Sequence, residues 1–157
     1  MRNFNINCFV LMMVIAIVLT GCSDGTPTGS SADFTGNWTM TNTTTSSSII
    51  GIGVGSTTTA KCNITDNNGS LAIHNFRIVG QEFIKWDTGY GTRIGNNLTA
   101  NVSGSYINIY RDPVSLTIYF EGDINANGIS GTGYWTQTYN IYGLIDSASG
   151  ATVFVKG

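Results

Sequence analysis

Alternation of apolar and polar residues dominates residues 34–157 and constrains the fold more than any other feature. In "SLTIYFEGDI", Leu116, Ile118, Phe120 and Ile124 fall on one face of an extended strand. A strand of this kind packs one face on a core and exposes the other. No convincing stretch after Asp33 has the spacing of about 3.6 residues that an amphipathic helix requires. The sequence therefore predicts an all-β domain.

Clusters of Asn, Asp, Ser and Gly interrupt the apolar runs and fit hairpin turns at Asp66–Gly69, 95–97, Asn125–Gly128 and Ser147–Gly150. Asn and Gly supply the positive φ that tight hairpin turns need. The predicted strands are 36–44, 57–65, 70–79, 82–87, 97–103, 105–111, 114–124, 129–139, 140–145 and 151–156. We therefore expect an antiparallel meander of about 8–10 strands.

A meander has to hide its edge strands, and closure into a barrel hides them completely. The first predicted strand opens with Gly36-Asn37-Trp38. This resembles the Gly-x-Trp opening of the lipocalin and avidin superfamily. The resemblance implies an antiparallel β-barrel in which Trp38 closes one end. A barrel is the favoured prediction, and a β-sandwich is the alternative.

The strand 129–139 places Gly131, Gly133 and Trp135 on the same face, opposite a partner strand that carries Phe120. Glycine opposite large apolar residues leaves volume unfilled, unless bent strands bring the facing wall close. A barrel of about eight strands is either filled by side chains or holds one small ligand. We expect a small apolar ligand, with Trp38, Phe120 and Trp135 as its binding residues. The alternative function is a cell-surface interaction module, a sandwich that binds a glycan or a protein partner.

An apolar run, Cys8 to Leu19, follows a short N-terminal region whose only charged side chain is Arg2. As a helix it would be about 18 Å long, which is too short to span a bilayer comfortably. Such a segment is typical of a secretory signal peptide. It ends at Leu19-Thr20-Gly21-Cys22, which resembles the lipobox of bacterial lipoproteins. The resemblance implies cleavage before Cys22 and acylation of this cysteine, which would attach the chain to a membrane.

These features predict three parts: a lipoprotein signal peptide at 1–21, the lipidated Cys22 with a flexible tether at 22–33, and a single all-β domain at 34–157. The tether is polar and rich in Gly and Ser, without apolar periodicity. In bacteria with two membranes, aspartate directly after the lipidated cysteine typically retains a lipoprotein in the inner membrane. Ser23 occupies that position here. We therefore expect a location in the cell envelope, at the outer membrane if the organism has two membranes.

Charged residues make up only 10% of the chain, its formal net charge is −2, and no basic cluster occurs, so a nucleic-acid partner is not expected. Asp123 to Gly128 matches the first half of a calcium loop, but the twelfth position is Tyr134 instead of the required glutamate. Titratable groups are sparse and unclustered. We expect no enzyme activity, no catalytic residue, no cofactor and no metal site.

Two single residues have structural interpretations. Cys62 shares a strand face with Ala60 and Ile64, which indicates a buried small side chain. His74 is the only histidine, and the alternation changes phase beside it, between Ile73 and Phe76. A β-bulge near His74 would reconcile the two phases. We expect His74 at the surface or at a rim.

Overall fold

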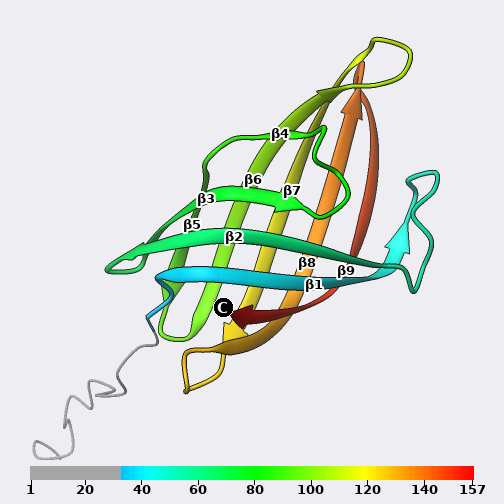
Figure 1. Cartoon of the computed structure of the whole chain (residues 1–157). Helices are drawn as coiled ribbons and strands as arrows, with labels where there is room; N and C mark the ends of the chain where they lie inside the picture. Colours follow the sequence, from blue (N-terminus) through cyan, green and yellow to red (C-terminus); the bar gives the residue numbers. More distant parts are fainter. Residues whose placement is uncertain (1–32) are drawn as a thin grey trace, which may run out of the picture. The chain divides into compact units, whose positions relative to one another are not determined.

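The computed structural model describes residues 33–157, which form nine β-strands (Figure 1). The strands are β1 (Gly36–Ser47), β2 (Thr57–Asn67), β3 (Ser70–Ile78), β4 (Lys85–Trp86), β5 (Gly89–Ile94), β6 (Asn97–Ile107), β7 (Pro113–Ile124), β8 (Ser130–Ile141) and β9 (Leu144–Lys156). All of the pairings are antiparallel. In Figure 1, β1, β2 and β3 cross in front of β6, β7 and β8.

Pairing between β6 and β7 closes the sheet, from Asn97 opposite Asp123 to Ile107 opposite Pro113. The closed order is β6-β5-β3-β2-β1-β9-β8-β7, an eight-stranded antiparallel barrel that is consistent with a lipocalin- or avidin-like barrel. The short β4 pairs with β6 beyond the part of β6 that β5 covers. The predicted meander and barrel are confirmed. The sandwich alternative is wrong, because the strand order forms one ring instead of two packed sheets.

Three of the four predicted turns are confirmed, at Asp66–Gly69, 95–97 and Asn125–Gly128. The turn predicted at Ser147–Gly150 is wrong, since these residues lie inside β9. The chain turns instead at Tyr142 and Gly143, whose φ angles of 52° and 86° suit a two-residue hairpin. Gly150 serves another purpose: a Cβ there would overlap the carbonyl oxygen of Thr43 on β1.

The sequence gives no signal for β5, because glycine occupies two of its positions that face the core side. A Cβ on Gly89 would lie 2.6 Å from Cγ2 of Val102, and one on Gly91 would lie 2.9 Å from Cβ of Ala100. Neighbouring residues therefore fill the space that apolar side chains of β5 would occupy. The two strands predicted at 97–103 and 105–111 are a single strand, β6, which continues through Gly104.

The bulge predicted near His74 is confirmed. Lys61 pairs with Arg77 and Asn63 pairs with His74, so two residues of β3, Asn75 and Phe76, lie opposite a single residue of β2. Asn75 has a φ of 52°, in the left-handed region that asparagine tolerates better than most residues. The bulge restores the inward direction of Phe76 and Ile78, which are buried.

Trp38 closes the end of the barrel at which the described chain begins. Its indole Nε1 donates a hydrogen bond to the carbonyl oxygen of Phe34 at 2.7 Å, and the two rings lie 6.0 Å apart. Phe34 is completely buried, and the ammonium group of Lys156 lies 6.0 Å from the centre of the Trp38 ring. We call this the closed end.

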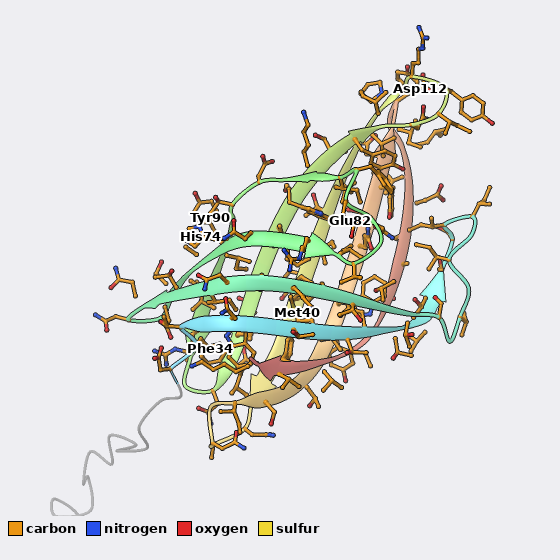
Figure 2. All side chains as sticks on the ribbon, in the orientation of Figure 1. Phe34, Met40, His74, Glu82, Tyr90 and Asp112 are labelled. Atoms are coloured by element: carbon orange, nitrogen blue, oxygen red, sulfur yellow. The ribbon has the colours of Figure 1, made fainter. Side chains whose placement is uncertain are left out.

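The opposite end, which we call the loop end, carries the connections at 48–56, 79–84, 108–112 and 142–143. Figure 2 shows Phe34 and Asp112 at opposite ends of the barrel.

Replacement of Trp38 tests the importance of the closed end. We expect Trp38→Ala to lower the free energy of unfolding by about 3–5 kcal/mol, because it leaves a cavity beneath Phe34. Trp38→Phe keeps most of the apolar volume and should cost less, since it chiefly loses the hydrogen bond to Phe34. Denaturant unfolding measures both values. A Trp38→Ala protein as stable as the unmodified protein would contradict this role.

Candidate functional site

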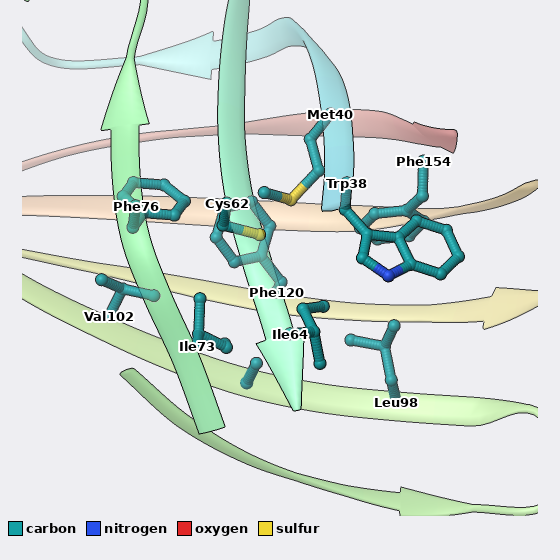
Figure 3. Close-up of a pocket in the computed structure, with 11 residues that line it drawn as sticks. Trp38, Met40, Cys62, Ile64, Ile73, Phe76, Leu98, Val102, Phe120 and Phe154 are labelled. Carbon is teal, nitrogen blue, oxygen red and sulfur yellow. The ribbon is translucent and has the colours of Figure 1, made fainter. Parts of the chain in front are cut away.

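The interior of the barrel is almost completely filled. Trp38, Phe120 and Trp135, the predicted ligand-binding residues, are only 2%, 2% and 3% exposed. One internal cavity of about 20 Å³ is lined by apolar side chains, Trp38 and Phe120 among them (Figure 3). Trp135 does not line it. This space suits one water molecule by size, whereas small-molecule sites measure about 300–1,000 Å³. A ligand role for these three residues stays a prediction.

The glycines of β7 and β8 explain why the interior holds so little space. A Cβ on Gly122 would lie 2.6 Å from Cε2 of Phe154, and one on Gly131 would lie 2.9 Å from Cα of Ile124. A Cβ on Gly133 would overlap the carbonyl oxygen of Glu121. These glycines mark close approach of neighbouring strands and of a phenyl ring. The unfilled volume expected opposite them is therefore absent.

Polar side chains on the inner face of β1, β8 and β9 interrupt the apolar interior. Asn42 and Thr152 lie directly opposite each other on β1 and β9 and are 2% and 1% exposed. Asn42 Oδ1, Thr152 Oγ1 and Trp135 Nε1 are buried and have no hydrogen-bond partner among the described residues. By contrast, the buried Thr44 hydroxyl accepts a hydrogen bond from Ser56 Oγ at 3.1 Å. A buried polar atom without a partner costs stability, so each of these three side chains is locally destabilising.

Cys62 is a free cysteine on the inner face of β2, as the sequence predicts. Burial raises the pKa of its thiol to about 12, because the desolvated thiolate is disfavoured. Nucleophilic chemistry requires the thiolate. Cys62 therefore acts as an apolar packing residue beside Met40 and Ile64, which line the same small cavity.

A second hollow lies in the side of the barrel, where the wall is incomplete. β3 pairs with β5 only from Ser70 to Ile73, and β4 pairs with β6. Beyond Ile73, no strand pairing joins β3 to β4. The lateral cleft that results measures about 420 Å³ and is lined by His74, Asn75, Phe76, Arg77, Gln81, Glu82, Ile84, Trp86, Asp87 and Thr88. It combines the aromatic rings of Phe76 and Trp86 with a mixed set of polar side chains.

Packing fixes the position of Trp86 in the lateral cleft. Its ring meets Phe76 edge to face, with ring centres 4.7 Å apart. Its other contact is the backbone of β6, since a Cβ on Gly104 would lie 2.7 Å from Cε3 of Trp86. Gly104 is thus the residue that lets the indole lie against the strand. Aromatic pairs of this geometry add to the stability that burial supplies.

Two atoms of the lateral cleft lack internal partners. Gln81 Oε1 and Trp86 Nε1 are buried and make no hydrogen bond with any described residue. One is an acceptor and the other a donor. Beside them, Glu82 Oε1 accepts a hydrogen bond from the Gly80 amide at 3.0 Å. Hydrogen bonds from the backbone lower the pKa of Glu82, because they stabilise its carboxylate form.

The sequence predicts His74 at the surface or at a rim, and His74 lines the lateral cleft. The change of alternation beside it was the only signal for this site. Gln81, Ile84 and Trp86 come from the connection after β3 and from β4, so their approach to His74 depends on how that connection folds back. No residue pattern within 79–88 predicts this approach.

Cys22, the predicted lipidation site, lies outside the described residues, as do the predicted signal peptide and most of the tether. Among residues 33–157, no group of three His, Cys, Asp or Glu side chains is arranged to hold a metal ion. Within the same described range, no helix is long and apolar enough to cross a membrane. Comparison with protein-family models, curated proteins and solved structures finds no match.

Replacement of Thr152 tests whether its hydroxyl lacks a partner. Thr152→Val keeps the shape of the side chain and removes the buried hydroxyl, so we expect the free energy of unfolding to rise by about 1 kcal/mol. Thr44→Val is the matched control: it removes a buried hydroxyl that accepts from Ser56 and should lower stability by about 1 kcal/mol. Denaturant unfolding compares the two variants. Equal losses in both would mean that Thr152 has a partner after all.

Proposed function

We propose that this chain is a lipid-anchored, non-catalytic binding module of the bacterial cell envelope, and that it binds a saccharide in the lateral cleft. The observation that carries the proposal is the cleft itself, about 420 Å³ in volume, with Gln81 Oε1 and Trp86 Nε1 buried in its lining and unpartnered. In this proposal the barrel is a filled scaffold, and its interior holds no ligand.

Size and chemistry both favour a small hydroxyl-rich ligand. The cleft falls within the volume range of small-molecule sites, about 300–1,000 Å³, whereas the internal cavity is far below it. Its lining offers an indole for contact with a sugar ring, and it offers planar amide, carboxylate and guanidinium groups for hydroxyls. Acidic and basic side chains are both present, Glu82 and Asp87 with Arg77, so no single charge dominates. A neutral or zwitterionic sugar fits this balance.

The two unpartnered atoms further favour hydroxyl groups. Trp86 Nε1 needs an acceptor and Gln81 Oε1 needs a donor. A hydroxyl group is both, so sugar hydroxyls that reach these buried atoms when the lining shifts can satisfy them. Buried polar atoms that gain partners on binding contribute to affinity, and they discriminate against ligands that lack the matching group.

Membrane attachment in this proposal rests on Leu19-Thr20-Gly21-Cys22. Two or three acyl chains on one cysteine hold a protein at a membrane effectively permanently, because each buried methylene contributes about 0.8 kcal/mol. Residues 23–33 then serve as the tether. The absence of catalysis is part of the proposal and follows from the scarcity of titratable side chains in the sequence.

The anchor is tested by Cys22→Ser in the bacterial host. We expect the variant to lose the lipid-dependent mass increase and cleavage after Gly21, because serine lacks the thiol that is acylated. Mass spectrometry and membrane fractionation measure both effects. Cys62→Ser is the matched control and should leave processing unchanged. Unaltered mass and fractionation in Cys22→Ser would rule out the lipid anchor.

The lateral cleft is tested by titrating the protein with a panel of monosaccharides and envelope-derived oligosaccharides. We expect a binder to change tryptophan fluorescence, since Trp86 lines the cleft. Trp86→Phe removes the Nε1 donor and, measured by titration calorimetry because the reporter is lost, should weaken binding about two- to tenfold, the effect of one hydrogen bond. Trp135→Phe removes an unpartnered indole donor in the barrel interior and is the matched control. No binding by any sugar of the panel, or equal binding by both variants, would contradict the proposal.

A further inference from the structure

Exposed apolar side chains gather at the loop end of the barrel. Each of its four connections contributes at least one. They include Ile50 and Val54 at 48–56, Phe83 at 79–84, Ile109 and Tyr110 at 108–112, and Tyr142 at the β8–β9 turn. Large exposed apolar patches on a folded domain mark surfaces that another apolar body covers. The loop end is therefore the candidate docking surface of the described domain.

The β1–β2 connection, "SIIGIGVGS", has the most apolar composition of the four. Ile50 is 99% exposed and Val54 is 73% exposed, so these side chains project from the barrel with few contacts of their own. No charged residue occurs between Asp33 and Lys61, and three glycines keep the connection slender. Internal hydrogen bonds satisfy part of its backbone, including Ile52 N to Ile49 O at 3.2 Å and Gly55 N to Thr44 O at 2.8 Å.

Charge on the four connections is low and nearly balanced. Their charged side chains are Glu82, Arg111 and Asp112. Asp112 accepts hydrogen bonds from the Tyr142 hydroxyl at 2.7 Å and from the Asn108 amide group at 3.3 Å, so its charge is partly satisfied within the loop end. The contact between Tyr142 and Asp112 also ties the β8–β9 turn to the β6–β7 connection. The surface is aliphatic and tyrosine-rich, without a basic cluster.

We infer that the loop end inserts its apolar tips into the interfacial region of a neutral lipid bilayer. Aliphatic side chains that project singly from loops can be buried in any apolar medium, and lipid is such a medium. A protein partner would instead have to offer a surface whose shape complements these side chains. Tyrosine prefers the boundary between headgroups and acyl chains. Some backbone N–H and C=O groups of the β1–β2 connection have no partner among the described residues. They limit insertion to that shallow depth, because the hydrocarbon core contains no water to form hydrogen bonds with them. Arg111 is the single basic side chain of the four connections and is offset by Glu82 and Asp112, so the surface has no electrostatic preference for anionic lipid.

This inference does not depend on saccharide binding. It is compatible with the proposed anchor, since eleven residues, 23–33, separate Cys22 from the end of the tether. Such a chain spans at most about 40 Å when fully extended. That reach allows the barrel to turn its loop end toward the bilayer that holds Cys22.

The experiment uses the full chain in phosphatidylcholine vesicles with and without brominated acyl chains. Ile50→Trp places a reporter at the loop end, and Ile94→Trp places one at the β5–β6 turn near the closed end, where Ile94 is 82% exposed. Both side chains are exposed, so neither substitution disturbs the core. We expect Ile50→Trp to show blue-shifted emission and additional quenching by the brominated lipid, independent of salt. Ile94→Trp should differ little from the unmodified protein in quenching.

Three outcomes would overturn the inference. Equal quenching of the two reporters would mean that the loop end has no preference for lipid. No quenching of either reporter would leave a protein partner as the occupant. A blue shift of Ile50→Trp that depends on the protein-to-lipid ratio, without bromine quenching, would indicate a second copy of the chain. Co-sedimentation with the vesicles is measured on the same samples, so a protein that has left the vesicle because the anchor proposal fails is distinguished from these results.

Discussion

Hydrogen bonds between β6 and β7 join the two ends of the sheet, and the other features of the barrel depend on this closure. Closure gives the long strands a neighbour on each side and turns one face of the meander into an interior. The interior is narrow enough for its buried side chains, Phe120, Phe154 and Trp38 among them, to fill almost all of it. The same closure leaves one gap, beyond Ile73, where β3 has no strand partner on the β4 side. The lateral cleft is therefore a consequence of how the ring is closed.

Much of the barrel is predictable from sequence, because burial imposes alternation on strands such as β7 and because positive φ imposes Asn and Gly on three hairpin turns. The prediction failed where glycine has a packing role. Three glycines lie inside strands and not in turns, where neighbouring atoms occupy the position that a Cβ would take: Gly89, Gly91 and Gly150. The candidate site was only partly accessible to sequence reasoning. The change of phase at His74 signals a bulge, but the approach of Trp86 depends on Gly104, which is distant in sequence.

A filled interior changes what this fold can do. Binding inside the barrel would require large side chains such as Phe120 to move, at the cost of the contacts that stabilise the closed wall. Binding at the lateral cleft or at the loop end requires no such rearrangement, because Trp86 and Ile50 are already in place. The two surfaces meet at the 79–84 connection, where Gln81, Glu82 and Ile84 line the lateral cleft and Phe83 is exposed at the loop end. The rigid barrel fixes the geometry of both.

The position of Cys62 also affects how copies of this chain behave toward one another. Its thiol has a pKa of about 12 and lies inside the barrel, so at neutral pH it is protonated and out of reach of another thiol. Disulfide exchange requires a thiolate with access to its target. In an oxidising compartment, Cys62 of the folded domain therefore forms no disulfide with a second copy. This thiol is exposed only when the domain unfolds, so the rate of folding sets the period during which two copies can become cross-linked through Cys62.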